Sequence, residues 1–342
     1  MDFETALLHW YDSSKRILPW RNDPSPYHVW LSEIMLQQTR VEAVKGYYER
    51  FLKTLPSIEA LAMASEETVL KLWEGLGYYS RARNLQKTAK ILIRDYQGIL
   101  PSEKQLLLSL PGIGPYTAAA IMAIAYQKKA VAFDGNLGRV YARLTKEKQP
   151  LSLPTVKEAG QRYFEERLET NPSAFNQALM DLGELLCLPH GYPRCEDCPF
   201  SSFCLAHQAH QEMNYPVASL AKTKKQERIT ILLLRFDGRY AIRQRPSQGL
   251  LANLYEFPHW EGMATKAVLQ QKLQENHILY DSFRSFGKTR HVFTHLIWNM
   301  VGYEITLQTK WEKEGLLYVT PEEMKSRYAI PSAFRFYQEK IK

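Results

Sequence analysis

Four cysteines lie close together in one short stretch, and no other cysteine occurs in the 342 residues of the chain. Their spacing is Cys187-x7-Cys195-x2-Cys198-x5-Cys204. A disulfide framework spreads its cysteines along a secreted chain, whereas clustered thiols are typical of a metal site. Four thiolates suit either a tetrahedral zinc ion or an iron–sulfur cluster, and the spacing alone leaves these two alternatives equal.

Two carboxylates, Glu33 and Asp134, could divide acid and base chemistry between them, because different environments move the pKa values of two such groups apart. Glu33 lies among the apolar residues of WLSEIMLQQTRV, residues 30–41. Burial there would raise its pKa and suit it to act as a general acid. Asp134 precedes a helix predicted over residues 135–144, where it can cap the first turn and stay ionised. The alternatives are a solvated helix glutamate and a simple capping aspartate.

A turn with two glycines joins two predicted helices in LPGIGPYT, residues 110–117. Glycine permits positive φ and close backbone approach, and the N–H groups of the following helix N-terminus can bind a phosphate. Gly112 and Gly114 are therefore candidate DNA phosphate contacts, with an ordinary helix–helix turn as the alternative. The formal net charge of +8 favours a polyanionic partner, although solubility alone also explains it.

Residues 1–206 are predicted to form an almost wholly helical domain, since apolar residues recur there at helical spacing between Pro, Ser and Gly signals. Helices are expected to begin at Pro26 and to cover residues 41–52, 81–96, 103–109, 115–126, 135–144, 155–169 and 174–186. The cysteines then form a loop at 187–204. Residues 207–228 are polar and aperiodic and are interpreted as a linker.

Residues 229–342 are predicted to form a second, α+β domain. A hairpin is expected at Asp237-Gly238, between strands at 229–236 and 239–245. Further elements are expected as a helix at 264–275, strands at 283–286 and 292–305, and a helix that begins at the capping box of residues 320–323. No stretch is long enough to span a bilayer and the N-terminus has no signal pattern, so a cytoplasmic, nucleoid-associated protein is expected.

Together these motifs resemble the helix-hairpin-helix DNA glycosylases, and within them the adenine DNA glycosylases of the MutY type. The resemblance covers about residues 8–342 and is most specific before residue 206. It implies an all-α glycosylase domain that carries a 4Fe-4S cluster on Cys187, Cys195, Cys198 and Cys204, followed by a Nudix-like domain that recognises the lesion.

The resemblance also implies a monofunctional glycosylase of base excision repair, acting as a monomer on double-stranded DNA. It would hydrolyse the N-glycosidic bond of adenine opposite 8-oxoguanine, and also opposite guanine, after flipping the nucleotide out. Glu33 would protonate the adenine and Asp134 would stabilise the sugar cation, with Tyr116 and Asn136 in support. Related bifunctional enzymes carry a lysine in place of Tyr116, so little or no lyase activity is expected.

Further site residues follow from the same resemblance. The adenine pocket would contain Trp20, Arg21 and Gln177. The side facing the opposite base would contain Gln38, Thr39, Leu76, the wedge residue Tyr78, and the lesion-reading residues Phe293, Thr294 and His295. Arg194 would contact a phosphate.

The sequence departs from the family pattern at several positions. The first cysteine gap has seven residues where six are common, threonine replaces serine at position 294, Phe133 is bulkier than usual, and Gly138 follows Asn136-Leu137. Residues 268–275, VLQQKLQE, replace the carboxylate-rich helix of Nudix hydrolases, so no hydrolase activity is expected there. The alternative functions are a glycosylase for thymine opposite guanine and a non-catalytic DNA-damage-binding protein.

Overall fold

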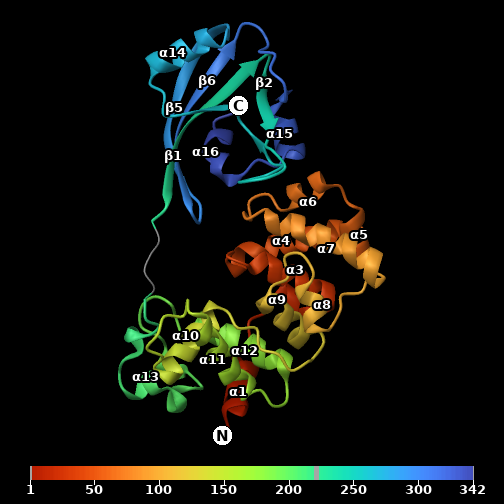
Figure 1. Cartoon of the computed structure of the whole chain (residues 1–342), viewed down its shortest axis with the longest axis vertical. Helices are drawn as coiled ribbons and strands as arrows, with labels where there is room; N and C mark the ends of the chain where they lie inside the picture. Colours follow the sequence, from red (N-terminus) through yellow and green to blue (C-terminus); the bar gives the residue numbers. More distant parts are fainter. Residues whose placement is uncertain (1, 219–222, 342) are drawn as a thin grey trace. The chain divides into compact units, whose positions relative to one another are not determined.

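The computed structural model describes residues 2–218 and 223–341, which belong to two compact units (Figure 1). The first unit comprises residues 1–64 and 84–221, and the second comprises residues 65–83 and 222–342. Residues 65–83, which the sequence analysis groups with the helical domain, thus cluster with the C-terminal part of the chain. Residues 219–222 of the expected linker lie outside the described residues.

The first unit is helical, as expected from the apolar periodicity of its sequence. Its helices are α1 (Phe3–Ser14), α2 (Pro19–Asn22), α3 (Pro26–Leu36), α4 (Val41–Thr54), α5 (Ile58–Met63), α7 (Ser80–Tyr96), α8 (Lys104–Leu108), α9 (Pro115–Ala120), the π-helix η1 (Ile121–Ala125), α10 (Gly135–Thr145), α11 (Pro154–Glu165), α12 (Pro172–Leu185) and α13 (Leu205–Gln208), with 3-10 turns η2 (Cys195–Asp197), η3 (Ser201–Phe203) and η4 (Glu212–Asn214). The division between the two units falls within α7.

Aromatic packing joins the cysteine loop to the core of the first unit. Phe3 of α1 stacks on Phe200 of the loop, with 4.0 Å between ring centroids and 18° between ring planes. Both residues belong to one buried cluster with Phe164 and Phe175 from α11 and α12. Fully burying such a ring stabilises the fold by about 1.5–3 kcal/mol. The Phe200 ring therefore anchors the cysteine loop to the helices of the first unit.

The second unit contains α6 (Glu66–Leu72) and the C-terminal α+β fold. Its other elements are β1 (Lys225–Phe236), β2 (Arg239–Gln244), β3 (Tyr255–Glu256), β4 (His259–Glu261), α14 (Lys266–Glu275), β5 (Tyr280–Val292), β6 (Leu296–Leu307), β7 (Leu316–Val319), α15 (Pro321–Arg327), the 3-10 turn η5 (Ser332–Phe334) and α16 (Arg335–Gln338). The expected capping box is confirmed, because the Thr320 and Glu323 side chains cap each other's backbone.

One mixed sheet forms the centre of this fold, with strand order β3-β2-β1-β6-β5 and with β4 on β1 and β7 on β2. The β1 and β6 strands are parallel and the other pairs are antiparallel. Leu269 and Leu273 of α14 pack on one face of the sheet, and Phe334 and Tyr337 pack on the other. Figure 1 shows α14 and α16 on opposite sides of the sheet.

Two sequence predictions for this region are wrong. The strand predicted over residues 292–305 is interrupted, because the Phe293 N–H donates to the Leu296 carbonyl at 2.8 Å and closes a tight turn between β5 and β6. β5 is also longer than the predicted 283–286. It is the edge strand and is largely exposed, so its sequence lacks the alternation that marks a half-buried strand.

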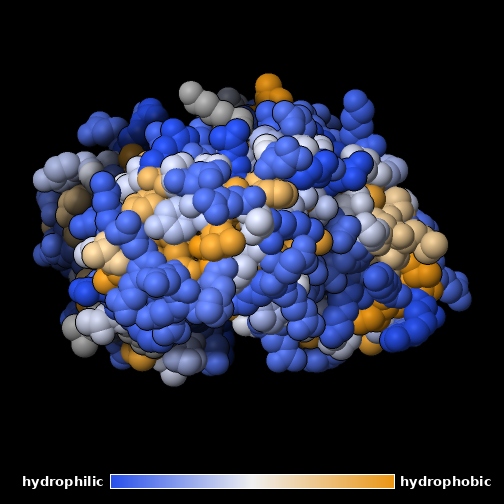
Figure 2. All heavy atoms as spheres, turned by 90° about the horizontal axis from the view of Figure 1, so that it is seen from above, coloured by the Kyte–Doolittle hydropathy of each residue, from blue (hydrophilic) through white to orange (hydrophobic). Residues whose placement is uncertain are grey.

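The interpretation of residues 207–228 as a plain linker is wrong at both ends, since α13 ends at Gln208, η4 follows at Glu212, and β1 already begins at Lys225. In the described part of the chain, every helix is too short or too polar to cross a membrane. Figure 2 shows a face that is mostly hydrophilic, with hydrophobic residues in separate groups.

Candidate active site and cysteine loop

One cavity of about 430 Å³ in the first unit brings most of the predicted site residues together. We call it the carboxylate cavity. Nine sequence-predicted residues line it, and they are Trp20, Arg21, Glu33, Gln38, Thr39, Tyr116, Asp134, Asn136 and Gln177. Its size is within the roughly 300–1,000 Å³ of small-molecule sites. Glu33 and Asp134, which lie about a hundred residues apart in the chain, therefore face one space.

Glu33 lies in the last turn of α3, which begins at the Ser25 cap and Pro26. Its side chain is buried, with 5% of the residue exposed. Burial raises the pKa of Glu33 from its ordinary 4.5 to about 7, against a hydrogen bond from Tyr116 that lowers it. The Oε2 atom has no hydrogen-bond partner among the residues that the structure describes. A carboxyl group of this kind holds its proton near neutral pH and can donate it into the cavity.

Asp134 caps α10, as its sequence position predicts. Its Oδ1 accepts the N–H groups of Asn136 and Leu137 at 2.8 Å each, and its Oδ2 accepts the Asn136 side-chain amide at 3.2 Å. Burial nevertheless raises the pKa of Asp134 above its ordinary value, since desolvation outweighs these bonds. The helix N-terminus therefore favours the ionised carboxylate that the sequence predicts, while burial opposes it.

Tyr116 lies near both carboxylates, in the first turn of α9. Its hydroxyl hydrogen-bonds to Glu33, and burial together with the two nearby negative groups raises the pKa of Tyr116 well above its ordinary value. The phenol therefore stays protonated and serves as a hydrogen-bond donor. A lysine amine can form an imine with a sugar aldehyde, but a tyrosine phenol cannot.

The turn before α9 needs glycine at one of its two glycine positions. Gly112 has φ +81°, and a Cβ there would lie 2.8 Å from the Cβ of Asn84. Gly114 is the N-cap of α9, with φ −95° and ψ 180°, which any residue can adopt. A Cβ at Gly114 would meet no atom within 4 Å, so this position leaves open space before the helix N-terminus.

A buried carboxylate that the sequence analysis missed fixes the arginine of the cavity. Asp181 is fully buried, and its two oxygens accept two hydrogen bonds from Arg21, at 2.7 and 2.9 Å. Arg16 binds the same carboxylate at 2.6 Å. Asp181 lies four residues after Gln177 on α12, so helical spacing from a predicted site residue was the available signal.

Residues of α12 spaced three and four apart line one side of the cavity, and they are Gln177, Met180 and Glu184. The Gln177 amide donates to the Ser173 hydroxyl at 3.0 Å, which orients its other polar atom. Trp20 on the opposite wall is buried and packs edge-to-face on Tyr48, with 5.6 Å between ring centroids.

Phe133, the bulky residue before Asp134, belongs to the core and does not line the carboxylate cavity. Its ring lies where a Cβ on Gly160 would come within 2.5 Å of it, whereas a Cβ on Gly138 would lie 3.7 Å away, at an ordinary contact distance. Gly160 therefore provides the space for the larger ring. The unusual residue at 133 leaves the cavity lining unchanged.

Arg139 connects the carboxylate cavity to the cysteine loop. Its guanidinium donates to the Asn136 side-chain oxygen at 2.9 Å and to the Cys187 carbonyl at 2.7 Å. Asn136 in turn binds Asp134. A displacement of the loop at Cys187 would therefore reach the Asp134 carboxylate through two side chains.

The four cysteines line one small apolar cavity with Val140, Leu144 and Phe200. A single zinc ion needs its four sulfurs about 3.8 Å apart, because Zn–S bonds are about 2.3 Å long. Within residues 2–218 and 223–341, a single group of three metal-ligand atoms lies within 4.8 Å of one another, and Cys195 is the only one of the four cysteines in that group. The thiols are thus spread more widely than one zinc ion requires, which fits a larger cluster.

The seven-residue gap after Cys187 is accommodated at the surface. The Arg194 N–H donates to the Leu186 carbonyl at 2.9 Å and closes the loop, while Gly191 has φ +74° and Tyr192 is exposed. The Arg194 side chain is exposed and pairs with Asp197 at 2.7 Å.

A second cavity, of about 560 Å³, lies within the second unit. The other residues predicted to face the opposite base line it, and they are Leu76, Tyr78, Phe293, Thr294 and His295. We call it the wedge cavity. The Tyr78 hydroxyl and the Thr294 hydroxyl hydrogen-bond at 2.8 Å. Thr294 is therefore exposed in the β5–β6 turn and joined to the wedge, in contrast to a strand threonine packed on a neighbour.

Arg81 holds the loop that carries Tyr78. Its Nη2 donates to the carbonyls of Leu76 and Gly77 at 3.1 Å each, and its guanidinium lies 5.2 Å from the centre of the Trp73 ring. Tyr78 has φ +47°, in the left-handed region. This backbone conformation costs a residue other than glycine roughly 1–2 kcal/mol of conformational energy. The loop is thus a strained conformation that a buried guanidinium stabilises.

Comparison with known proteins gives consistent results for the two parts of the chain. The family model described as HhH-GPD superfamily base excision DNA repair protein matches residues 31–165, and a NUDIX domain model matches residues 229–340. Adenine DNA glycosylase of Homo sapiens is 32% identical over 98% of this chain and 74% of its own length. Adenine DNA glycosylase of Buchnera aphidicola subsp. Schizaphis graminum is 30% identical over 89% of this chain and 88% of its own length. The solved structure of a thermostable thymine-DNA glycosylase has a TM-score of 0.55 at 29% identity, over 60% of this chain and 95% of that chain.

Proposed function

The chain belongs to the adenine DNA glycosylases of the HhH-GPD superfamily, and from this premise we propose that it removes adenine mispaired with 8-oxoguanine, and secondarily with guanine. It is a base excision repair hydrolase that cleaves an N-glycosidic bond and binds DNA. The observation that carries the proposal is the pair of carboxylates on one cavity, of which Glu33 keeps its proton near neutral pH.

In the proposed reaction, the adenine nucleotide leaves the duplex and enters the carboxylate cavity, at a cost of about a few kcal/mol. Glu33 transfers its proton to N7 of the adenine. The C1′–N9 bond then breaks and its electron pair leaves with the base, which departs as neutral adenine. The Asp134 carboxylate stabilises the positive charge that remains on the sugar.

Water then adds to C1′ from the open side of the cavity. It gives up one proton to a carboxylate, so that Glu33 regains its acid form and the sugar keeps a hydroxyl group. Arg21 and Gln177 would bind polar edges of the adenine, and Trp20 would pack against its face. Each of these side chains is held by another protein group, so little rotamer freedom is lost when the base binds.

Strand cleavage should be weak or absent, because a β-elimination mechanism needs an amine that forms an imine at C1′. By the family resemblance, Tyr116 would stand where bifunctional relatives carry that amine, and its raised pKa keeps it a neutral phenol. Nudix hydrolysis is also not expected. That chemistry needs a group of carboxylates to hold a metal ion, and α14 contains Glu275 as its single acidic residue.

The second unit would recognise the opposite base through Tyr78 and the Phe293–His295 turn. Stacking of one base on an aromatic ring contributes about 1–3 kcal/mol, which offsets part of the cost of separating the base pairs. Tyr78 is half exposed and available for such an insertion. Gln38 and Thr39 would contribute from the rim of the carboxylate cavity.

The four cysteines would hold a 4Fe-4S cluster, because their sulfurs share one apolar cavity and Arg143 donates to the Cys187 sulfur at 3.2 Å. Sulfur ligands of iron–sulfur clusters accept hydrogen bonds of this kind. When bound, the cluster would supply rigidity and no chemistry to the hydrolysis. The loop would present Arg194 to a DNA phosphate, beside a contact from the Gly112–Gly114 turn.

Duplexes with a single defined mispair test the proposal. Adenine release should be fastest opposite 8-oxoguanine, slower opposite guanine, and absent opposite thymine, with no strand break until alkali is added. Glu33→Gln should abolish release while it preserves binding. Release of thymine from a thymine–guanine duplex in place of adenine would contradict the proposal, and so would binding to the mispair without release of any base.

A further inference from the structure

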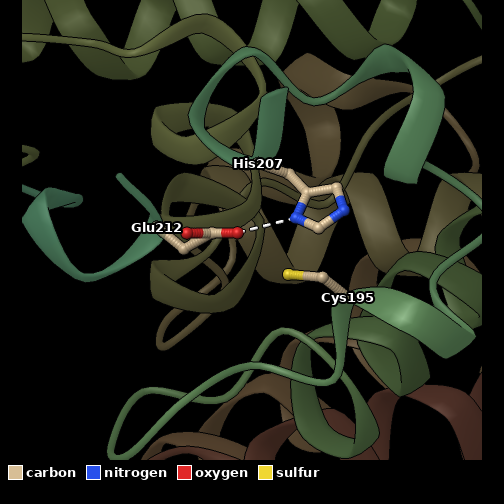
Figure 3. A group of neighbouring side chains, drawn as sticks. All are labelled: Cys195, His207 and Glu212. Carbon is tan, nitrogen blue, oxygen red and sulfur yellow. Dashed lines mark hydrogen bonds and ion pairs between the residues drawn. The ribbon is translucent and has the colours of Figure 1, made fainter. Parts of the chain in front are cut away.

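Three side chains that line the cysteine cavity form a candidate site for a single metal ion. They are Cys195 in η2, His207 in α13 and Glu212 in η4 (Figure 3). One ligand atom from each lies within 4.8 Å of the other two. Figure 3 shows the thiol, the imidazole and the carboxylate approaching one another from three separate short elements.

Backbone contacts hold His207 and Glu212 in place before any metal binds. The Gln211 N–H donates to the Ala206 carbonyl at 2.8 Å and closes the turn between α13 and η4. Arg143 of α10 donates to the Glu212 carbonyl at 3.1 Å, and this bond fixes η4 to the helical core. The site therefore does not need a disordered loop to fold around the ion, which lowers the entropic cost of binding.

The donor set selects the kind of metal. It offers one thiolate sulfur, one imidazole nitrogen and one carboxylate oxygen, which is a mixed set that suits zinc and excludes Mg²⁺ and Ca²⁺, whose ligands are oxygens. A thiolate and a carboxylate together neutralise a divalent ion. His207 and Glu212 are partly buried, with 32% and 17% of their side chains exposed, so a neutral complex costs less desolvation than a charged one.

The spacing of the donors also fits one ion. His207 Nδ1 lies 2.6 Å from the Glu212 Oε1 atom, so the two ligands already meet at one point. Zinc bonds of about 2.0–2.3 Å would separate neighbouring ligand atoms by somewhat more than 3 Å. A small rotation of the imidazole and the carboxylate provides that separation, and water can take the fourth position.

We propose that Cys195, His207 and Glu212 form a binding site for one zinc ion in the cluster-free chain. Cys195 is also one of the four proposed cluster ligands, so zinc and the iron–sulfur cluster exclude each other. The cluster-free chain would then be able to take up zinc in place of iron, and zinc bound there would block assembly of the cluster until it is released.

The test uses the full-length chain, with its cluster removed by oxidation and chelation and its thiols then reduced. Zinc is titrated against a competing chelator. The unsubstituted chain should bind one zinc ion. Glu212→Gln should weaken binding by at least about 10-fold, because loss of even an outer-shell partner of a metal ligand typically costs about 10–100-fold in affinity. His207→Ala should weaken it at least as much.

Cys198→Ala is the matched control, because Cys198 is a proposed cluster ligand that lies outside the zinc site. It should leave the zinc affinity unchanged and abolish cluster assembly, whereas His207→Ala should assemble the cluster and lose zinc. The opposite pattern, with zinc lost in Cys198→Ala and kept in His207→Ala, would assign zinc to the four cysteines and overturn the proposal. Far-UV circular dichroism checks that each variant remains folded.

Cobalt(II) gives a second measurement that needs no variant. In the cluster-free chain it should show thiolate charge-transfer absorbance of the strength of one Co–S bond, and the strength of four Co–S bonds would refute the site. The cluster-loaded chain should bind neither ion at this position. Adenine release by the loaded chain is measured separately, so failure of the zinc site leaves the proposed glycosylase function intact.

Discussion

Substituting Glu33 by glutamine should make the protein more stable at alkaline pH while it removes activity. The folded chain raises the pKa of Glu33 from 4.5 to about 7 by burying it. The unfolded chain thus loses this proton near pH 4.5 and the folded chain keeps it until about pH 7. The stability that the buried acid contributes is fully present below pH 4.5 and is lost as the pH rises to 7. Glutamine stays neutral throughout and escapes this loss.

The expected gain follows from the pKa difference, since each pKa unit corresponds to about 1.4 kcal/mol. Glu33→Gln should stabilise the chain by less than about 1 kcal/mol at about pH 5, and by about 3 kcal/mol at about pH 8.5. Urea denaturation followed by far-UV circular dichroism measures the difference, because the first unit supplies most of the helical signal.

Glu184→Gln is the control, since that carboxylate lines the same cavity but is exposed. It should change stability equally at both pH values. A Glu33→Gln variant whose stability relative to the unsubstituted chain is the same at both pH values would refute the assignment of Glu33 as a buried acid.

Three further predictions concern residues that support the two cavities. Gly160→Ala should destabilise the chain by about 1–3 kcal/mol, because the added methyl group overpacks against Phe133. Adding the substitution Phe133→Leu should restore the urea midpoint of unfolding. Equal midpoints for the single and double variants would contradict this prediction. Asp181→Asn should cost about 3–5 kcal/mol, because it removes the fully buried carboxylate that pairs with two partly buried guanidinium groups. A loss below about 1 kcal/mol in the same measurement would show that the carboxylate is not buried in solution. Arg81→Met should release the strained loop and reduce insertion of Tyr78 into the DNA. The measurement is the quenching of a fluorescent base next to the mispair, which should become weaker. Unchanged quenching would mean that the loop keeps its conformation without Arg81.

Local signals in the sequence predicted much of this fold correctly. The aspartate before Gly135 and the threonine before Pro321 cap their helices as expected, because a capping side chain acts only on the next few residues. The helical character of the first unit and the α+β character of the second also follow from local periodicity. Such features need no knowledge of which elements pack together.

Contacts between residues far apart in sequence were not predictable in the same way. Asp181 binds Arg16 and Arg21 across more than a hundred and fifty residues, and no periodicity in either segment indicates the pairing. The space that Gly160 leaves for the Phe133 ring is of the same kind. These arrangements depend on tertiary packing, which a single sequence does not report.

The polar segment after the cysteines illustrates a different difficulty. Its lack of periodicity favoured a linker, yet two of its residues, His207 and Glu212, are fixed against the cysteine loop. Short turns of three or four residues do not complete a helical period, so their hydrophobic pattern carries little information. The candidate ligands could have been found by their residue types, since a histidine and a glutamate follow four cysteines closely.

The pH dependence of adenine release tests the central role of Glu33 most directly. Single-turnover rates are measured with excess enzyme on a duplex that contains adenine opposite 8-oxoguanine. The rate should fall as the pH rises above neutral, approaching about tenfold per pH unit, because the reaction uses the protonated form of this buried acid. A rate that stays level into the alkaline range, or a Glu33→Gln variant as fast as the unsubstituted chain, would contradict the account.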